Sequence, residues 1–252
     1  MTAPTLLLDA DILAYQFSSM AETPIKWDER LWTLHADEDE AYDNLQDRIQ
    51  QLKDSLGGGD VVVCLSDSHN FRKDVLPTYK SNRKDVRKPL VLSALKERMT
   101  KDYRTFVRPS LEADDVLGIL ATGRAIPGEK LVVTIDKDLR SVPCQFMDLR
   151  YLTNPPVTVD VDEADRWHMR QTLTGDTVDG YAGCPGIGPK RAEGILEGAT
   201  SVAEMWQRVV EVYAKAGLSE ADALIQARVA RILRSCDYDF QNKQPKLWNP
   251  PQ

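Results

Sequence analysis

The chain alternates between short, continuous apolar runs and longer segments with helical spacing. Residues 5–8, 61–65 and 131–135 are runs rich in Val, Ile and Leu. Such runs are typical of parallel strands that are buried on both faces of a sheet. The segments between them have the length and spacing of helices. The pattern therefore predicts an α/β fold with a central, mostly parallel sheet flanked by helices.

Two helices of this first half can be placed by their end signals. Residues 37–56 have helical spacing and stop at three consecutive glycines, 57–59. A second helix is predicted to begin with Ser110 as its N-cap, because an apolar stripe follows that residue. Trp27 and Trp32 precede the first of these helices and are interpreted as packing residues.

The composition becomes helical toward the C-terminus. A Gly- and Pro-rich hairpin at 184–189 is followed by two predicted helices, 202–216 and 220–234. We therefore expect an α/β domain at 1–155 and a smaller helical subdomain at 156–252.

Cysteine, histidine and charge exclude several classes of protein. The four cysteines form no C-x-x-C pair and the three histidines lie far apart, which signals neither a disulfide framework nor a zinc site. No stretch approaches the roughly 20 apolar residues of a membrane span, so we expect a soluble, cytoplasmic protein. The net charge of −7 argues against indiscriminate nucleic-acid binding but leaves room for local basic patches.

Acidic residues follow each predicted strand. Because parallel strands end at one edge of a sheet, Asp9, Asp67 and Asp136 are expected to lie together. Acids in the first turn of the helix after Ser110 are ordinary for a helix N-terminus, but this helix starts beside the same edge. Asp11 is a weaker candidate, because it points to the opposite face if the strand continues. Nine carboxylates are predicted to converge: Asp9, Asp67, Glu112, Asp114, Asp115, Asp136, Asp138, Asp176 and Asp179.

So many anions repel one another unless divalent cations neutralise them or some carboxyl groups stay protonated. Oxygen ligands without His or Cys select Mg²⁺ or Mn²⁺ over zinc. Two such ions about 3.5–4 Å apart can promote in-line displacement at a phosphodiester. The carboxylates therefore indicate metal-dependent hydrolysis of a nucleic-acid backbone.

A basic segment lies between the second and third predicted strands. It follows Asp67 directly and includes Tyr79, whose ring can stack on an unpaired base. A solvated surface is the alternative interpretation. We expect the segment to contact DNA phosphates, with an affinity that falls steeply with salt. Its cations are Arg72, Lys73, Lys80, Arg83, Lys84, Arg87 and Lys88.

Five blocks of the chain resemble, in order and spacing, the metal-dependent 5′-nucleases, which include flap endonucleases and 5′-3′ exonucleases. The blocks are Leu8-Asp9-Ala10-Asp11, Ser66-Asp67, Leu111-Glu112-Ala113-Asp114-Asp115, Asp136-Lys137-Asp138-Leu139, and Gly175-Asp176 through Lys190. Similarity to the small exonucleases of short-tailed phages covers nearly the whole chain. The resemblance implies a PIN-like 5′-nuclease fold with a helical arch at about 68–105 and a helix-hairpin-helix element.

The resemblance also implies roles for single residues. Asp9, Asp67, Glu112 and Asp114 would hold one Mg²⁺ ion, while Asp115, Asp136, Asp138, Asp176 and Asp179 would serve a second, with Asp115 as a candidate bridge and catalytic residue. Lys80 and Arg83 would stabilise charge that develops at the scissile phosphate. The hairpin would hold a K⁺ ion and grip the duplex through Gly186, Gly188, Lys190 and Arg191.

The function expected from these features is a structure-selective 5′-3′ exonuclease or flap endonuclease. Its substrate would be duplex DNA with a free 5′ end or 5′ flap, with RNA–DNA hybrid as a second candidate, in a bacterial host cytoplasm. One alternative is a non-catalytic nucleic-acid-binding module, against which the complete acidic set with Lys80 argues. The other is a PIN-type ribonuclease, against which the hairpin element argues.

Overall fold

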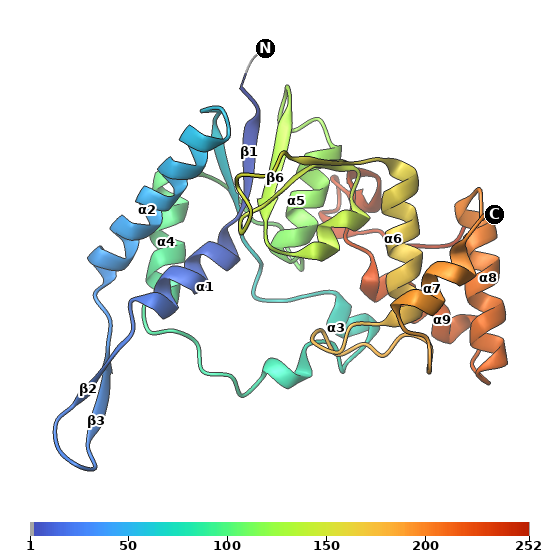
Figure 1. Cartoon of the computed structure of the whole chain (residues 1–252), viewed down its shortest axis with the longest axis horizontal. Coiled ribbons are helices and arrows are strands. Elements are labelled where there is room, and N and C mark those ends of the chain that lie inside the picture. Colours follow the sequence, from blue (N-terminus) through green and yellow to red (C-terminus); the bar gives the residue numbers. More distant parts are fainter. Residues whose placement is uncertain (1–2, 252) are drawn as a thin grey trace.

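A six-stranded sheet forms the centre of the molecule (Figure 1), a computed structural model that describes residues 3–251. The strand order is β5-β4-β1-β6-β7-β8, and only the β7–β8 pair is antiparallel. The three predicted apolar runs are confirmed as neighbouring central strands. The bounds are β1 Thr5–Asp9, β4 Val61–Cys64, β5 Arg104–Phe106, β6 Lys130–Thr134, β7 Cys144–Asp148 and β8 Val157–Val159.

Helices cover both faces of this sheet. Leu6 and Leu8 pack against α1, α2 and α4 on one face, while Leu7 packs against α5 on the other. Burial on both sides removes the usual polar alternation, which is why the central strands are apolar throughout. The helices span α1 Ala10–Met20, α2 Glu38–Ser55, α4 Leu92–Asp102 and α5 Ala113–Thr122.

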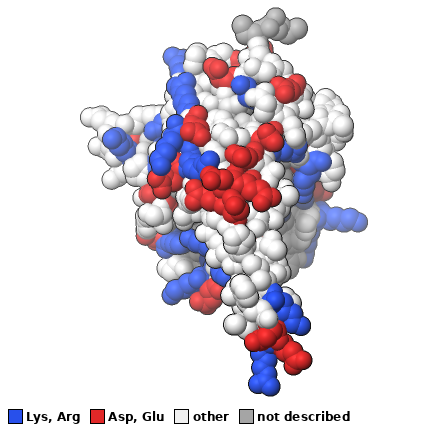
Figure 2. Space-filling model, turned by 90° about the vertical axis from the view of Figure 1, so that its left-hand side faces the viewer, with Lys and Arg blue, Asp and Glu red and all other residues white. Residues whose placement is uncertain are grey.

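A two-stranded hairpin projects from the body between α1 and α2 (Figures 1 and 2). It consists of β2 Thr23–Lys26 and β3 Trp32–His35, paired antiparallel. Trp27 and Trp32 are 64% and 55% exposed, so the interpretation of both as packing residues is wrong. The hairpin reaches past the helices that cover the sheet, and its rings therefore have no core to enter.

The N-terminus of α5 differs from the prediction. Ser110 has a φ of +62° and lies in the loop before the helix. Glu112 is the N-cap, and Asp115 completes a capping box with it. The helix therefore starts two residues later than a Ser110 cap would place it, which brings Glu112 and Asp114 to the carboxyl edge of the sheet.

The segment at 68–105 is not the helical arch that the resemblance implies. It contains α3 Arg72–Val75, a short 3₁₀ turn η1 Ser81–Arg83, and then an extended path to α4. α4 belongs to the body instead, because its Leu95 and Met99 are buried in the core with α1 and α2. The residues from Ser81 to Lys88 are exposed, with no apolar stripe that would hold a long helix.

The C-terminal helices have an apolar core of their own. This core lies among α6 Val161–Thr174, α7 Pro189–Leu196, α8 Val202–Lys215 and α9 Glu220–Ala230, and includes Met169, Trp206 and Tyr213. The chain then returns to the α5 side of the sheet, where Ile232 and Leu233 are buried. The short elements η2 Lys137–Ser141, η3 Ser235–Asp237, β9 Tyr238–Asp239 and β10 Gln244–Pro245 complete the chain.

Among residues 3–251, no helix is both long and apolar enough to cross a bilayer.

Candidate active site

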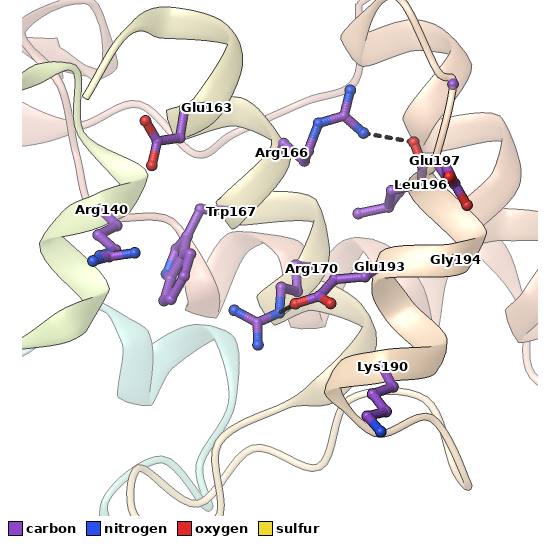
Figure 3. A pocket seen from close by; sticks show the side chains of 11 residues that line it. Arg140, Glu163, Arg166, Trp167, Arg170, Lys190, Glu193, Gly194, Leu196 and Glu197 are labelled. Carbon is purple, nitrogen blue, oxygen red and sulfur yellow. Dashed lines mark hydrogen bonds and ion pairs between the residues drawn. The ribbon is translucent and has the colours of Figure 1, made fainter. Parts of the chain in front are cut away.

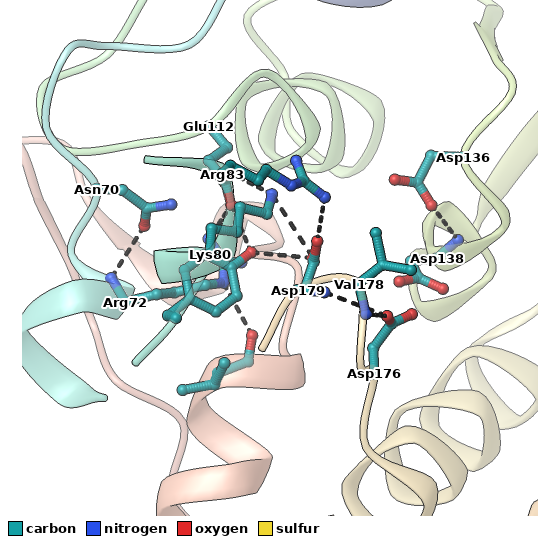
Figure 4. Close-up of polar contacts among 12 residues, drawn as sticks. Asn70, Arg72, Lys80, Arg83, Glu112, Asp136, Asp138, Asp176, Val178 and Asp179 are labelled. Carbon is teal, nitrogen blue, oxygen red and sulfur yellow. Dashed lines mark hydrogen bonds and ion pairs between the residues drawn. The ribbon is translucent and has the colours of Figure 1, made fainter. Parts of the chain in front are cut away.

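The carboxyl edge of the sheet brings acids from distant segments into one hollow. Asp9 ends β1 and caps α1, Asp136 caps η2 directly after β6, and Asp114 lies in the first turn of α5. Asp179 enters from the loop after α6 (Figure 4). The hollow is lined by Arg72, Tyr79, Glu112, Asp114, Asp136, Asp138, Asp179 and Tyr181, among others.

Burial and mutual repulsion favour protonation of several of these acids. Burial, reinforced by the neighbouring Asp11, raises the pKa of Asp9 to about 7. Burial and the charge of Asp136 raise the pKa of Asp138 to about 7 as well. The pKa of Asp114 lies well above its usual value for the same reasons, with Asp136 and Asp9 as the repelling neighbours. Near neutral pH, bound protons or cations therefore stabilise this group of carboxylates.

The negative charge of Glu112 is balanced by neighbouring donors. Its Oε1 lies 2.6 Å from Nζ of Lys80, and its Oε2 accepts a 2.8 Å hydrogen bond from the hydroxyl of Tyr79. Burial raises the pKa of Glu112, but Lys80 and Arg72 outweigh that effect and lower it to about 2. Glu112 is therefore ionised throughout the working pH range.

Two loops meet closely beside Glu112. The backbone N–H of Lys80 donates to the carbonyl of Asp179 at 2.7 Å, and Lys80 itself has a left-handed φ of +51°. Gly180 permits this approach, because a Cβ there would lie 2.8 Å from the carbonyl oxygen of Thr78. Arg83 Nη2 lies 2.6 Å from Asp179 Oδ1. Lys80 and Arg83, the predicted catalytic cations, thus form ion pairs with predicted metal ligands.

Asp115 is not part of the open pocket. It has no exposed surface, and its two oxygens accept hydrogen bonds from Arg72 Nη1 and Nη2, each at 2.7 Å. Oδ1 also accepts from the backbone of Leu233, and Oδ2 accepts from the backbone of Glu112. The interpretation of Asp115 as a bridging metal ligand and catalytic residue is therefore wrong, because these donors already satisfy both of its oxygens.

Arg72 is likewise not a DNA contact. Its side chain is 3% exposed, and besides Asp115 it donates to the carbonyls of Val229 and Arg231. It joins α3, α5 and the segment after α9. A buried guanidinium held by these acceptors cannot reach a phosphate on the surface, so its role is structural.

Neither Asp67 nor Asp11 is among the residues that line the hollow. Asp67 accepts from the backbone N–H groups of Ser110 and Ser68, each at 2.8 Å, and these bonds lower its pKa. Asp11 is in the first turn of α1, where it pairs with Lys96 at 2.6 Å and accepts from Ser66. The strand ends before Asp11, so the alternation that would turn it away from the edge does not apply.

Tyr79 is 3% exposed and its hydroxyl donates to Glu112 and Asp179, so the interpretation of its ring as a stacking surface for a base is wrong. Apart from Lys80 and Arg83, the remaining predicted DNA-binding residues lie on the surface. Lys73, Lys84 and Lys88, with Gly186, Gly188, Lys190 and Arg191 of the hairpin, are all exposed. Arg87 is exposed too, but both of its terminal nitrogens contact the carboxylate of Glu22 at 2.7 and 2.6 Å. Their contacts with DNA stay predictions.

Some residues of the pocket were missed by the sequence interpretation. Tyr181 lines it, and burial, reinforced by the nearby acids, holds the pKa of Tyr181 far above the usual value. Lys137 Nζ lies 3.5 Å from Asp176 Oδ2. Lys137 is inside the Asp136-Lys137-Asp138 block, so its proximity to the acids could have been inferred from the sequence. Tyr181 gave no such signal.

The pocket has the oxygen ligands that a divalent cation prefers, but they are not arranged around one coordination centre. In the described chain, no group of three or more His, Cys, Asp or Glu side chains is arranged to hold a metal ion. Over the same residues, however, Asp114 Oδ1 and Asp138 Oδ1 are buried without any hydrogen-bond partner. Unpaired carboxylate oxygens with no sulfur or imidazole donor fit hard cations such as Mg²⁺.

This fold and this acidic edge define an α/β protein of the 5′-nuclease class. The family model of the 5′-3′ exonuclease N-terminal resolvase-like domain matches residues 5–165. The chain is 33% identical to the exonuclease of Escherichia phage T7 over 97% of its own length and 93% of that protein. The chain belongs to the 5′-3′ exonuclease family.

A further relative and a solved structure are similar to the chain. The flap endonuclease Xni of Shewanella oneidensis is 30% identical over 67% of the chain and 69% of that protein. The crystal structure of the bacteriophage T5 D15 flap endonuclease, in a pseudo-enzyme-product complex with DNA and metal ions, superposes with a TM-score of 0.62 at 17% identity. It covers 90% of the chain and 93% of that structure, and it shows that the fold is shared.

Proposed function

We propose that this protein is a structure-selective 5′-3′ exonuclease and flap endonuclease that hydrolyses DNA phosphodiesters with two divalent metal ions. The observation that carries the proposal is the acidic hollow at the carboxyl edge of the sheet, where burial raises the pKa of Asp9 and Asp138 to about 7. Family membership supports the direction and the class of cleavage. RNA paired to DNA is a further candidate substrate, and the bacterial cytoplasm is the expected setting.

Magnesium is the proposed metal, with manganese as a substitute. Asp9, Glu112 and Asp114 would hold one ion, and Asp136, Asp138, Asp176 and Asp179 the other, with Asp67 within the same edge. When bound, the ions supply the positive charge that polarises a phosphodiester and acidifies water. The buried, unpaired oxygens of Asp114 and Asp138 support this assignment.

Lys80 and Arg83 are proposed to act on the scissile phosphate. Both cations now sit on carboxylates, Lys80 on Glu112 and Arg83 on Asp179. Once metal charge neutralises those acids, the ammonium and guanidinium groups are free to donate to non-bridging phosphate oxygens. Donors held in place before the reaction stabilise charge that develops in the transition state.

The turn before α7 is proposed to hold the duplex. Pro189 begins α7, and Gly186 has a φ of +75° with open space where a side chain would stand. A backbone phosphate can therefore approach the N–H groups of this turn closely. A K⁺ ion in this helix-hairpin-helix element, together with Lys190 and Arg191, would complete the grip.

Cleavage of defined substrates tests the proposal. The protein is incubated with 5′-labelled flap, nicked, blunt duplex and RNA–DNA hybrid substrates, in Mg²⁺ or in EDTA. Short 5′ products from the flap and nicked DNA are expected in Mg²⁺ only. No cleavage of any substrate in Mg²⁺ would refute the nuclease, and equal cleavage from a 3′ end would refute the polarity.

A further inference from the structure

A cleft of about 700 Å³ lies outside the acidic hollow, between η2, α6 and α7 (Figure 3). Basic side chains reach it from all three elements: Arg140 from η2, Arg166 and Arg170 from α6, and Lys190 from α7. Three glutamates, Glu163, Glu193 and Glu197, also line the cleft. Trp167 stands in the middle of the group.

Trp167 holds two of these arginines against its ring. The guanidinium carbons of Arg140 and Arg170 lie 5.4 and 4.8 Å from the ring centroid. A guanidinium that stacks on an aromatic face keeps its N–H edge available for a bidentate acceptor. The indole therefore fixes the positions of two cations without using up their hydrogen-bond donors.

The donors of these cations are largely free. Across residues 3–251, Arg140 and Lys190 have no hydrogen bond or ion pair from their side chains, and Arg170 has one 3.5 Å contact with Glu193. Arg166 differs, because its guanidinium donates to the carbonyls of Leu196 and Ala199. Arg166 holds the end of α7 in place, whereas Arg140, Arg170 and Lys190 are available to an anion.

The cleft continues into the acidic hollow. A second depression is lined by Trp167 and Arg170 at one end and by Asp138 and Asp176 at the other. Asp138 in turn lines the acidic hollow itself. A polymer with one phosphodiester in the hollow could therefore extend along this path. The α2 side offers no such path, since α2 exposes six acids and the face in Figure 2 has acidic side chains at its centre.

We propose that Arg140 and Arg170, held by Trp167, form a clamp for the phosphodiester backbone of the DNA strand that enters the acidic hollow, with Lys190 as a third contact. Trp167 is a positioning residue and touches no substrate. The clamp binds two successive phosphates a short distance from the cleaved bond. This inference rests on the proposed nuclease function, because that function supplies the strand.

The test measures DNA binding and cleavage separately. Binding of a fluorescein-labelled 5′-flap duplex and of a single-stranded oligonucleotide is followed by anisotropy in EDTA over a KCl series. Log K, where K is the DNA association constant, falls as log salt rises. The double variant Arg140→Ala/Arg170→Ala is expected to make this slope less steep by about 1.8 on the duplex, about 0.9 for each lost phosphate contact. In Mg²⁺ the double variant is expected to raise KM with little change in kcat, because the lost contacts bind the ground state and the transition state equally.

Two controls separate the clamp from a general charge effect or a folding defect. Arg124→Ala removes an exposed cation after α5, at the opposite edge of the sheet, and should leave slope and KM unchanged. Trp167→Leu should reproduce the double variant, while Trp167→Phe, which keeps an aromatic face, should restore most of the slope. Thermal unfolding of each variant verifies that the fold is intact.

The outcomes for the clamp and for the nuclease are distinct. If the double variant matches Arg124→Ala in slope and KM while the wild type cleaves DNA, the clamp is refuted and the nuclease stands. If the wild type cleaves nothing but the double variant's slope is still about 1.8 less steep than that of the wild type, the clamp stands and the nuclease is refuted. On the single-stranded oligonucleotide the clamp predicts a slope that is less steep by about 1.4, about 0.7 for each lost contact, and an unchanged slope there would contradict contacts with the strand that enters the hollow.

Discussion

Arg72 and Asp115 form a bidentate ion pair that is sealed from solvent, with both N–O distances at 2.7 Å and side chains that are 3% and 0% exposed. The pair joins α3 to α5, and further bonds from both partners reach the backbone after α9. Asp114, one residue earlier, has a buried oxygen with no partner. Neighbouring aspartates on one helix thus have different tasks.

Substitutions at Asp115 and Asp114 are therefore expected to have opposite effects on thermal stability. Asp115→Asn removes the charged bidentate partner of the buried Arg72 guanidinium and leaves only the longer 3.4 Å contact with Glu112. Breaking a buried pair costs about 3–5 kcal/mol. The midpoint of thermal unfolding should therefore fall by roughly 6–20 °C for a chain of this size. Calorimetry or circular dichroism measures the change. A midpoint within about a degree of the wild type would mean that the pair is not formed.

Asp114→Asn should instead leave the fold intact and abolish cleavage. The substitution removes a repelling charge from the pocket, so the unfolding midpoint in EDTA should stay the same or rise. Turnover in Mg²⁺ should fall below detection, because a proposed metal ligand is lost. If Asp114→Asn cuts flap DNA at the normal rate, Asp114 is not a ligand.

Lys80→Ala tests the proposed transition-state contact. Removal of one positioned donor typically lowers kcat by about 10²–10³-fold. KM for flap DNA should change much less, since the loss concerns the transition state. Single-turnover kinetics separate the chemical step from product release, and Arg124→Ala serves as an exposed cation control. A KM effect alone would reassign Lys80 to ground-state binding.

Stability without metal should fall as the pH rises. The folded-state pKa values of Asp9 and Asp138 are raised to about 7, above the usual aspartate pKa of 3.8. Between these values the folded state binds more protons than the unfolded state, so this contribution is complete below about pH 4 and is lost as the pH rises through about 7.

Thermal unfolding in EDTA from pH 5 to pH 8 measures this dependence. The midpoint should decline over that interval, and Mg²⁺ should reverse the decline at pH 8. Asp9→Asn should raise the midpoint in EDTA at pH 8 by roughly 2–4 °C, the shift expected for about 1 kcal/mol in a chain of this length. A midpoint that rises with pH in EDTA would contradict the assigned repulsion.

The sequence was sufficient for the parts of the fold that local pattern determines. The strands β1, β4 and β6 are continuous apolar runs, and their terminal aspartates lie at one edge because the strands are parallel and adjacent. β5 and β8, with three residues each, are too short to leave a pattern of their own. The exposed β2–β3 hairpin has no buried face, so nothing in its apolar spacing could reveal it.

The errors in the candidate site have a common physical cause. Asp115 and Arg72 are 43 residues apart, and their pairing depends on how α3 docks on α5. From the sequence, Asp115 looks like Asp114, and Arg72 looks like the exposed Lys73. Burial decides between structural and functional roles for such residues, and burial of a charged side chain is fixed by long-range packing rather than by its neighbours in the chain.

The central claim is that the acids at the sheet edge bind divalent metal as one pocket. Anomalous diffraction from a crystal grown with Mn²⁺ tests it most directly. The account predicts two anomalous peaks about 3.5–4 Å apart, in contact with Asp114 and Asp138, with Lys80 moved off Glu112. An anomalous map with no peak in this hollow at saturating Mn²⁺ would contradict the claim.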